Sequence, residues 1–154
     1  MRLRQSGASG TMRCALFGVS LLLAAPALAA AAEPTGIWNT EDNEAQVQIA
    51  HCGAALCGHI IALREPRDPA THRPKTDEYN PDERLRHRPL IGVTIVVGMK
   101  PDGRPGHWTG RVYNPEDGRI YPAALTLRSH RALTLEGCLL KDALCRGQVW
   151  TRAK

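Results

Sequence analysis

Residues 45–63 read AQVQIAHCGAALCGHIIAL, and this stretch indicates the architecture of the whole chain. Polar and apolar side chains alternate from Ala45 to Cys52, and a second apolar run extends from Cys57 to Leu63. Alternation with a period of two is typical of a β-strand with one buried face, and a short connection containing glycine joins two such strands. The stretch therefore predicts an antiparallel hairpin.

The same pattern recurs on both sides of this hairpin. Strands are predicted over residues 36–40, 45–52, 57–63, 90–99, 107–113, 119–127, 132–138 and 147–152. Turn sequences such as Pro101-Asp102-Gly103 separate neighbouring strands. Sequential antiparallel strands of this number can close into a barrel, which removes the exposed edges of an open sheet. We therefore predict an all-β fold, a single small up-and-down β-barrel of about eight strands, with a β-sandwich as the alternative.

Alternation also assigns side chains to the two faces of the predicted barrel. The face expected to point inward carries Val47, Ile49, Ile60, Val93, Ile95, Val97, Trp108, Val112, Tyr121, Leu125, Leu133 and Leu135. Five of these are candidates for lining a ligand cavity, namely Trp108, Val112, Tyr121, Val93 and Ile95. In the alternative interpretation, the aromatic side chains simply fill a small barrel.

The N-terminus has the features of a secretory signal peptide. Three arginines precede an apolar run over residues 14–23, which is too short for a permanent membrane anchor. The alanine-rich stretch 27–32 follows and contains an Ala-x-Ala cleavage site, with cleavage expected near Ala29. A translation start at Met12 would give the same mature protein. We therefore expect a protein of the Gram-negative periplasm with no stable membrane anchor after cleavage.

Cleavage divides the chain into a signal peptide, residues 1–29, and one domain, residues 30–154, with its core at 36–152. The leader contains three of the 20 basic residues and none of the 15 acidic ones, so the formal charge falls from +5 to +2. With no basic stripe and no binding motif left, we predict no nucleic-acid partner. We also expect no cofactor and a monomeric protein.

Four cysteines follow the leader in two close pairs, Cys52 with Cys57 and Cys138 with Cys145. A hairpin would place the members of each pair directly opposite each other, at a separation that suits a disulfide in an oxidising compartment. We therefore predict two disulfides between neighbours. A metal site with His51 and His59 is the alternative, but the spacing differs from that of structural zinc sites. Alternation also puts His51 on the opposite face from Cys52, so no metal is predicted.

Two short motifs resemble the barrel signature of lipocalins. They are Gly36-Ile37-Trp38 near the start of the mature chain and Trp150-Thr151-Arg152 at its end. In that resemblance, the tryptophan of the first strand closes one end of the barrel and an arginine of the last strand lies across its ring. The resemblance therefore implies that Trp38 and Arg152 close the barrel through a cation–π contact.

A longer succession of motifs resembles the uncharacterised bacterial family known as domain of unknown function 2147. The motifs are Cys57-Gly58-His59-Ile60, Asp77-x-x-Asn80-Pro81, Arg88-Pro89-Leu90-Ile91-Gly92, Trp108 to Pro115, Gly118 with Tyr121, and Gly147 to Arg152. The resemblance covers residues 36–152 and implies a small exported barrel of lipocalin-like shape. It implies no known reaction, so no catalytic residue follows from it.

The sequence is compatible with three classes of function. A barrel of this size has room for one small ligand, so the first expectation is binding of a small apolar or amphiphilic molecule in the cell envelope. The long, charged, proline-containing connection 64–89 favours the alternative, a protein–protein interaction or inhibitor module that docks on an envelope protein. A hydrolytic enzyme is least expected, because the acid–base groups of that connection have no diagnostic spacing. These groups are His72, Asp77, Glu83 and His87.

Overall fold

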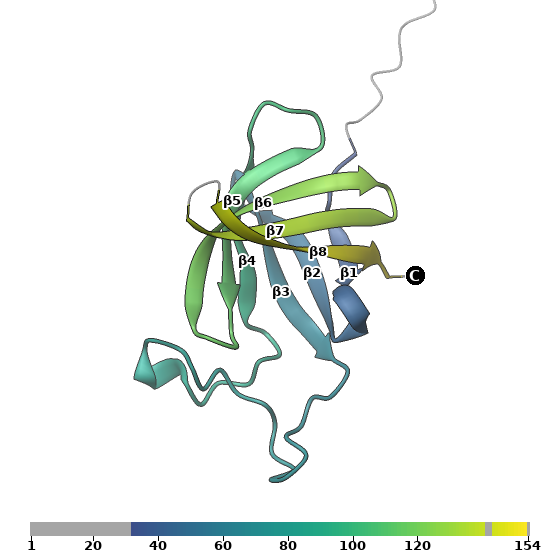
Figure 1. Ribbon diagram of the computed structural model, residues 1–154. Helices are drawn as coiled ribbons and strands as arrows, with labels where there is room; N and C mark the ends of the chain where they lie inside the picture. The colour runs from purple at the N-terminus through teal and green to yellow at the C-terminus, as the bar shows by residue number, and fades with distance from the viewer. Residues whose placement is uncertain (1–31, 141–142, 154) are drawn as a thin grey trace, which may run out of the picture.

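The computed structural model describes residues 32–140 and 143–153, and its strands form one closed barrel (Figure 1). The strands are β1 (Gly36–Asn39), β2 (Ala45–Cys52), β3 (Ala55–Leu63), β4 (Thr94–Pro101), β5 (His107–Asn114), β6 (Arg119–Ser129), β7 (Ala132–Leu140) and β8 (Ala143–Arg152). Their order around the barrel follows the sequence, and β8 returns to β1. The predicted antiparallel up-and-down barrel is confirmed, and the sandwich alternative is wrong.

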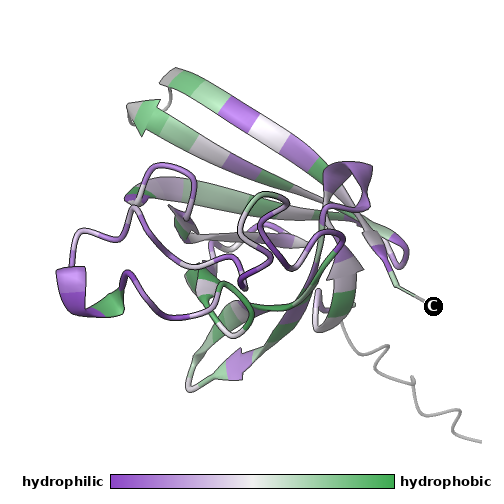
Figure 2. Cartoon of the chain, turned by 90° about the horizontal axis from the view of Figure 1, so that it is seen from below, coloured by the Kyte–Doolittle hydropathy of each residue, from purple (hydrophilic) through white to green (hydrophobic). Residues whose placement is uncertain are grey.

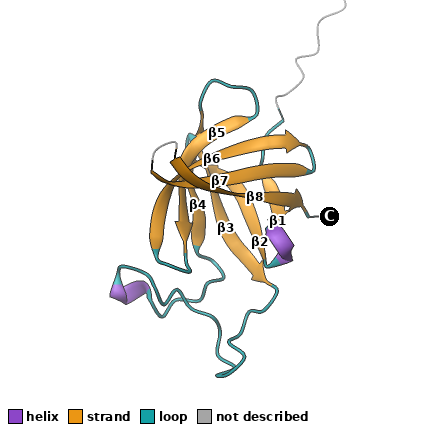
Figure 3. Ribbon diagram, in the orientation of Figure 1, coloured by secondary structure: helices purple, strands orange, loops and turns teal. Residues whose placement is uncertain are grey.

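Two short 3-10 helices lie in the connections, η1 (Glu41–Asn43) and η2 (Glu83–Leu85), and strands make up most of the rest (Figure 3). No helix in the described part of the chain has the length and apolar character needed to cross a membrane. The predicted signal peptide, residues 1–29, lies outside the described residues.

All the predicted strands are present, with shifts at their ends. The two largest shifts are of four residues each: β8 begins at Ala143 instead of Gly147, and β4 begins at Thr94 instead of Leu90. The Leu90 N–H donates to the carbonyl of Lys75 at 3.0 Å, and Gly92 has a φ of +100°, a conformation that other residues rarely adopt. Residues 90–93 therefore belong to the end of the long connection, although Gly92 and Val93 still exchange backbone hydrogen bonds with Ile60.

Apolar side chains fill the interior of the barrel. The largest of those that are fully buried are Trp38, Trp150, Ile49, Met99, Leu125 and Leu133. The predicted inward face is correct for Val47, Ile49, Ile60, Val93, Ile95, Trp108, Leu125, Leu133 and Leu135, all of which are buried. Three other predicted members, Val97, Val112 and Tyr121, are only half-buried.

The prediction for Val97 failed because β4 contains an irregularity. The pairing of β4 with β5 shifts register between Val97 and Lys100, next to Gly98 with a φ of +64°. The pairing of β3 with β4 also shifts register on both sides of the Gly58–Val96 pair, and such irregularities change the face on which neighbouring residues point. Val96 is therefore fully buried in place of Val97, whereas Met99 is fully buried as alternation from Ile95 predicts.

The contact between Trp38 and Arg152 closes the barrel, as the lipocalin resemblance implied. The first and last strands meet at two residue pairs, one of which is Trp38 with Arg152. The guanidinium carbon of Arg152 lies 4.2 Å from the centroid of the Trp38 ring. The same guanidinium donates to the carbonyl oxygens of Thr35 at 2.6 Å and His130 at 2.6 Å. One side chain therefore joins β1, β8 and the turn between β6 and β7.

Gly36 is required by this contact. Its φ is +127°, and a Cβ added there would lie 2.4 Å from Nη1 of Arg152. Two residues on, the Trp38 indole N–H donates to the carbonyl of Pro34 at 2.7 Å, which fixes the chain as it enters β1. The Gly-x-Trp spacing thus makes room for the guanidinium and places the ring beneath it.

Replacing Arg152 tests the closure. Arg152→Ala is expected to lower the free energy of unfolding by about 1 to 3 kcal/mol, because the ring loses its cation and the carbonyls lose their donor. Arg152→Lys should recover only part of this, since an ammonium does not stack as a planar guanidinium does. Chemical denaturation of Arg152→Ala, Trp38→Leu and the double variant gives the coupling between the two side chains. Fully additive losses would contradict a direct contact.

Candidate functional site

The two ends of the barrel differ in construction. The turn end carries the tight turns that follow Cys52, Pro101 and Ser129, and the chain enters β1 there. The loop end carries the long connection between β3 and β4 and the β5–β6 hairpin. In Figure 2, viewed from below, the long connection lies in front of the strands and is coloured mostly as hydrophilic.

A buried carboxylate fixes the long connection at the loop end. Asp77 has no exposed surface. Arg88 donates to its Oδ2 from Nε at 2.9 Å and from Nη2 at 2.7 Å, and Asn80 donates to the same oxygen at 2.7 Å. The Tyr113 hydroxyl donates to Oδ1 at 2.5 Å. A buried charge is tolerated when it is paired and hydrogen-bonded in this way, so the network ties the connection to β5.

Tyr113 was not on the predicted inward face, yet it is buried. By alternation it lies on the opposite face of β5 from Trp108 and Val112, and the connection covers it there. Burial, together with the hydrogen bond to the Asp77 carboxylate, raises the pKa of Tyr113 to about 12. The long connection also packs against the β5–β6 turn, because a Cβ on Gly118 would lie 1.8 Å from the carbonyl oxygen of Tyr79.

The acid–base groups of the connection do not converge on one point. Asp77 is enclosed by Arg88, Asn80 and Tyr113, whereas Glu83 pairs with Arg86 at 3.3 Å on the exposed side. Within the described residues, neither His72 nor His87 donates a side-chain hydrogen bond to either carboxylate. The arrangement therefore holds the connection in place and does not assemble a proton-transfer pair.

A hollow of about 230 Å³ opens at the turn end of the barrel. Its lining residues are Glu33, His51, Ala54, Ala55, Leu56, Met99, Pro101 and Trp108. They meet because Leu56 is paired with Met99 across β3 and β4, and Pro101 with Trp108 across β4 and β5. Three consecutive strands therefore build one wall.

The hollow has an apolar floor and a polar rim. Leu56, Met99 and Trp108 on the floor are buried. Glu33 and His51 on the rim are about half-exposed, and His51 Nε2 lies 2.9 Å from Glu33 Oε2. The hollow can therefore take an apolar group inside while a polar group stays near solvent.

Of the five predicted ligand-lining residues, Trp108 lines this hollow. Val93 and Ile95 are buried elsewhere in the core. Val112 and Tyr121 are paired with each other towards the loop end, where the Tyr121 hydroxyl donates to Asp117 in the β5–β6 turn. The structure does not bring these four side chains to the hollow.

Sequence reasoning missed most of the lining, for identifiable reasons. His51 shares a face with Val47 and Ile49, so alternation could have found it. Met99 is in phase with the buried Ile95 of β4, so alternation could have found it as well. Glu33 precedes the predicted core and carries no periodic signal at all.

A second hollow, of about 440 Å³, lies beside η1 and is more open and more polar. It is lined by Asn39, Asn43, Ala45, Gln46, Ala62, Leu63 and Arg64. Three of its polar side chains already have partners, since Gln46 Nε2 donates to Asn39 Oδ1 at 3.0 Å and Arg64 donates to the carbonyl of Asp42 at 3.0 Å. We do not take it as the binding site.

Both predicted disulfides are present, Cys52–Cys57 and Cys138–Cys145. The second joins directly opposite residues, as expected. The first does not, because the hairpin turns at Gly53 and Ala54 alone, and Cys52 then lies opposite Ala55. The Cys52–Cys57 bond is therefore diagonal, with a Cα–Cα distance of 5.7 Å.

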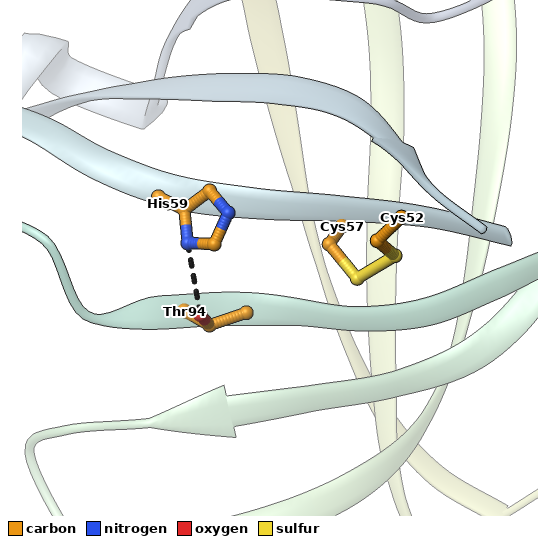
Figure 4. Close-up of a disulfide and its surroundings, with 4 residues drawn as sticks. All are labelled: Cys52, Cys57, His59 and Thr94. Atoms are coloured by element: carbon orange, nitrogen blue, oxygen red, sulfur yellow. Dashed lines mark hydrogen bonds between the residues drawn. A yellow bond between two sulfur atoms is a disulfide. The ribbon is translucent and has the colours of Figure 1, made fainter.

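The alternative of a metal site at the first cysteine pair is wrong for this structure. The two sulfur atoms are bonded to each other, and His59 Nδ1 lies 2.8 Å from the Thr94 hydroxyl on β4 (Figure 4). His51 points instead to Glu33. The disulfide thus fixes the hairpin whose inward residues, His51 and Leu56, line the hollow.

The chain matches the family model described as "Uncharacterized protein conserved in bacteria (DUF2147)" over residues 36–152. It belongs to the DUF2147 family. The matched region runs from Gly36 to Arg152, the two residues that meet at the barrel closure. No curated protein matches the chain.

This DUF2147 protein is also similar to a solved structure, protein HP1028 from the human pathogen Helicobacter pylori, which is described as belonging to the lipocalin family. The two share 21% sequence identity over 79% of this chain and 84% of that chain, with a TM-score of 0.67. At this identity the likeness establishes the fold, which is a lipocalin-like barrel.

The Asp77 network predicts a pH-dependent stability. Between about pH 10, where an ordinary tyrosine ionises, and about pH 12, the unfolded chain loses the Tyr113 proton and the folded protein keeps it. The free energy of unfolding should therefore fall as the pH rises through this window. Tyr113→Phe should remove that contribution and, at neutral pH, cost about 1 to 3 kcal/mol through the lost donor to Asp77. Denaturation curves across the window, with exposed Tyr79→Phe as the control, measure both effects.

Proposed function

We propose that this DUF2147 protein binds a small apolar or amphiphilic molecule in the hollow at the turn end, within the bacterial cell envelope. The observation that carries the proposal is the composition of the hollow, whose buried floor is apolar and whose rim holds the polar pair of Glu33 and His51. Sites for small molecules typically combine a largely apolar lining with a few convergent polar groups.

The chemistry of the floor fits a short apolar chain. Trp108 offers a large flat surface, and Met99 has a flexible, polarisable side chain that adapts to irregular shapes. Each methylene moved from water onto such a floor contributes about 0.8 kcal/mol to binding. The packed interior leaves the ligand at the mouth of the barrel, so its polar end would remain close to solvent.

Two observations support an envelope location. The two disulfides fit an oxidising compartment outside the cytosol. The basic and then apolar N-terminal sequence fits export.

A docking role for the 64–89 connection is the second candidate. The Asp77 network holds this segment in one shape while Tyr79 is 58% exposed and Leu85 is 37% exposed. Rigid, exposed apolar groups on a loop are typical of recognition surfaces. Both candidates are binding roles, and we propose no reaction.

Linear alcohols of increasing length test the proposed site. Calorimetric titration should show binding that tightens by about 0.8 kcal/mol per methylene and then levels off when the hollow is full. Ala54→Trp should abolish binding, because the indole would occupy the hollow from an exposed turn without disturbing the core. Ser129→Trp, at an exposed position of the same end, is the matched control and should bind normally. Equal binding by both variants would contradict this site.

The two disulfides should differ in their effect on binding. Replacing Cys52 and Cys57 together by Ser is expected to weaken hexanol binding by about fivefold, or about 1 kcal/mol, because the hairpin that carries His51 and Leu56 loses its staple. The matched change at Cys138 and Cys145 should leave the affinity unchanged. Each change removes a short-loop disulfide worth about 2 kcal/mol of stability, so binding is compared well below the unfolding temperature. Identical hexanol affinities in the two variants would contradict the proposal that the Cys52–Cys57 disulfide shapes the hollow.

A further inference from the structure

The rim of the hollow carries a negative charge that no cationic lining residue balances. Among the eight lining residues, Glu33 is the one with a permanent charge. Its Oε2 contacts His51 Nε2, and no other side chain within the described residues hydrogen-bonds to its carboxylate. The remaining oxygen is free to accept a hydrogen bond from a ligand.

Two guanidinium groups at the same end are engaged by other acceptors. Arg104 donates to Asp102 at 3.0 and 2.5 Å, and His107 lies 2.8 Å from the same carboxylate. Arg152 donates to main-chain carbonyls, of which that of Glu33 itself is the most distant at 3.4 Å. Arg152 therefore holds the backbone of Glu33 in place while its strongest bonds go elsewhere.

We propose that the hollow selects a ligand whose polar end is a cation, a short apolar chain bearing an ammonium group. This inference rests on the proposed function and adds the charge of the ligand. With the chain on the floor, the ammonium would reach the rim, where the Glu33 carboxylate accepts its hydrogen bonds. A carboxylate in the same place would face Glu33 and be repelled.

Three ligands of equal chain length test the inference, namely hexylammonium, hexanol and hexanoate at neutral pH. The wild-type protein should bind hexylammonium roughly three- to tenfold more tightly than hexanol, and hexanoate most weakly. Glu33→Gln keeps the size of the side chain and an acceptor for His51 but removes the charge, so hexylammonium affinity should fall to about that of hexanol measured on the same variant, and the preference for the ammonium disappears. Glu116→Gln, which removes an exposed carboxylate at the loop end, is the matched control and should keep the preference.

The outcomes separate the two proposals. If none of the three ligands binds, the proposed function fails. If hexanol binds but hexylammonium binds no more tightly, the cation preference is wrong and the proposed function stands. A preference that survives Glu33→Gln would overturn the role of Glu33. Hexylammonium binding that survives Ala54→Trp would place the cation outside the hollow and overturn the inference as well.

Discussion

The contact of the Arg152 guanidinium with the Trp38 ring is the interaction on which the rest of this barrel depends. β1 is a strand of four residues, Gly36–Asn39, and it meets β8 at only two residue pairs. Such a short seam offers few ladder hydrogen bonds, so a side chain that bonds to Thr35, Glu33 and His130 carbonyls supplies much of the closure. Because Arg152 also bonds to the backbone of the segment that enters β1, the contact that closes the barrel also positions Glu33 on the rim of the hollow.

The two ends of the barrel divide their tasks. At the loop end, a buried carboxylate with four side-chain hydrogen bonds locks the long connection onto β5, and the family motifs around Asp77, Asn80, Arg88, Tyr113 and Gly118 all serve that lock. At the turn end, tight turns and a diagonal disulfide surround a hollow with a buried apolar floor and a half-exposed polar rim. At the loop end the polar side chains are thus occupied by hydrogen bonds to one another, whereas at the turn end the Glu33 carboxylate keeps an oxygen that a ligand can reach.

The filled interior narrows the ways in which this lipocalin-like barrel can hold a ligand. Three tryptophans, Met99 and several leucines occupy the space between the strands, and the hollow that the apolar residues line lies at the mouth of the barrel. An apolar molecule can still gain free energy there, because part of its surface leaves water, but its polar end stays at the rim. A small amphiphile fits that geometry better than a long chain that needs a deep cavity.

The sequence by itself determined the barrel, because the period-two alternation and the turn residues are local signals that every strand carries, and it determined both disulfides through the spacing of their cysteines. Tertiary structure alone decided the site. Glu33 has no periodic pattern, Leu56 and Trp108 line one hollow because β3, β4 and β5 lie side by side, and Tyr113 is buried only because a segment more than thirty residues away carries Asp77 onto it. Alternation reports which face a side chain takes along one strand, whereas a hollow depends on which strands lie side by side and where a loop folds back.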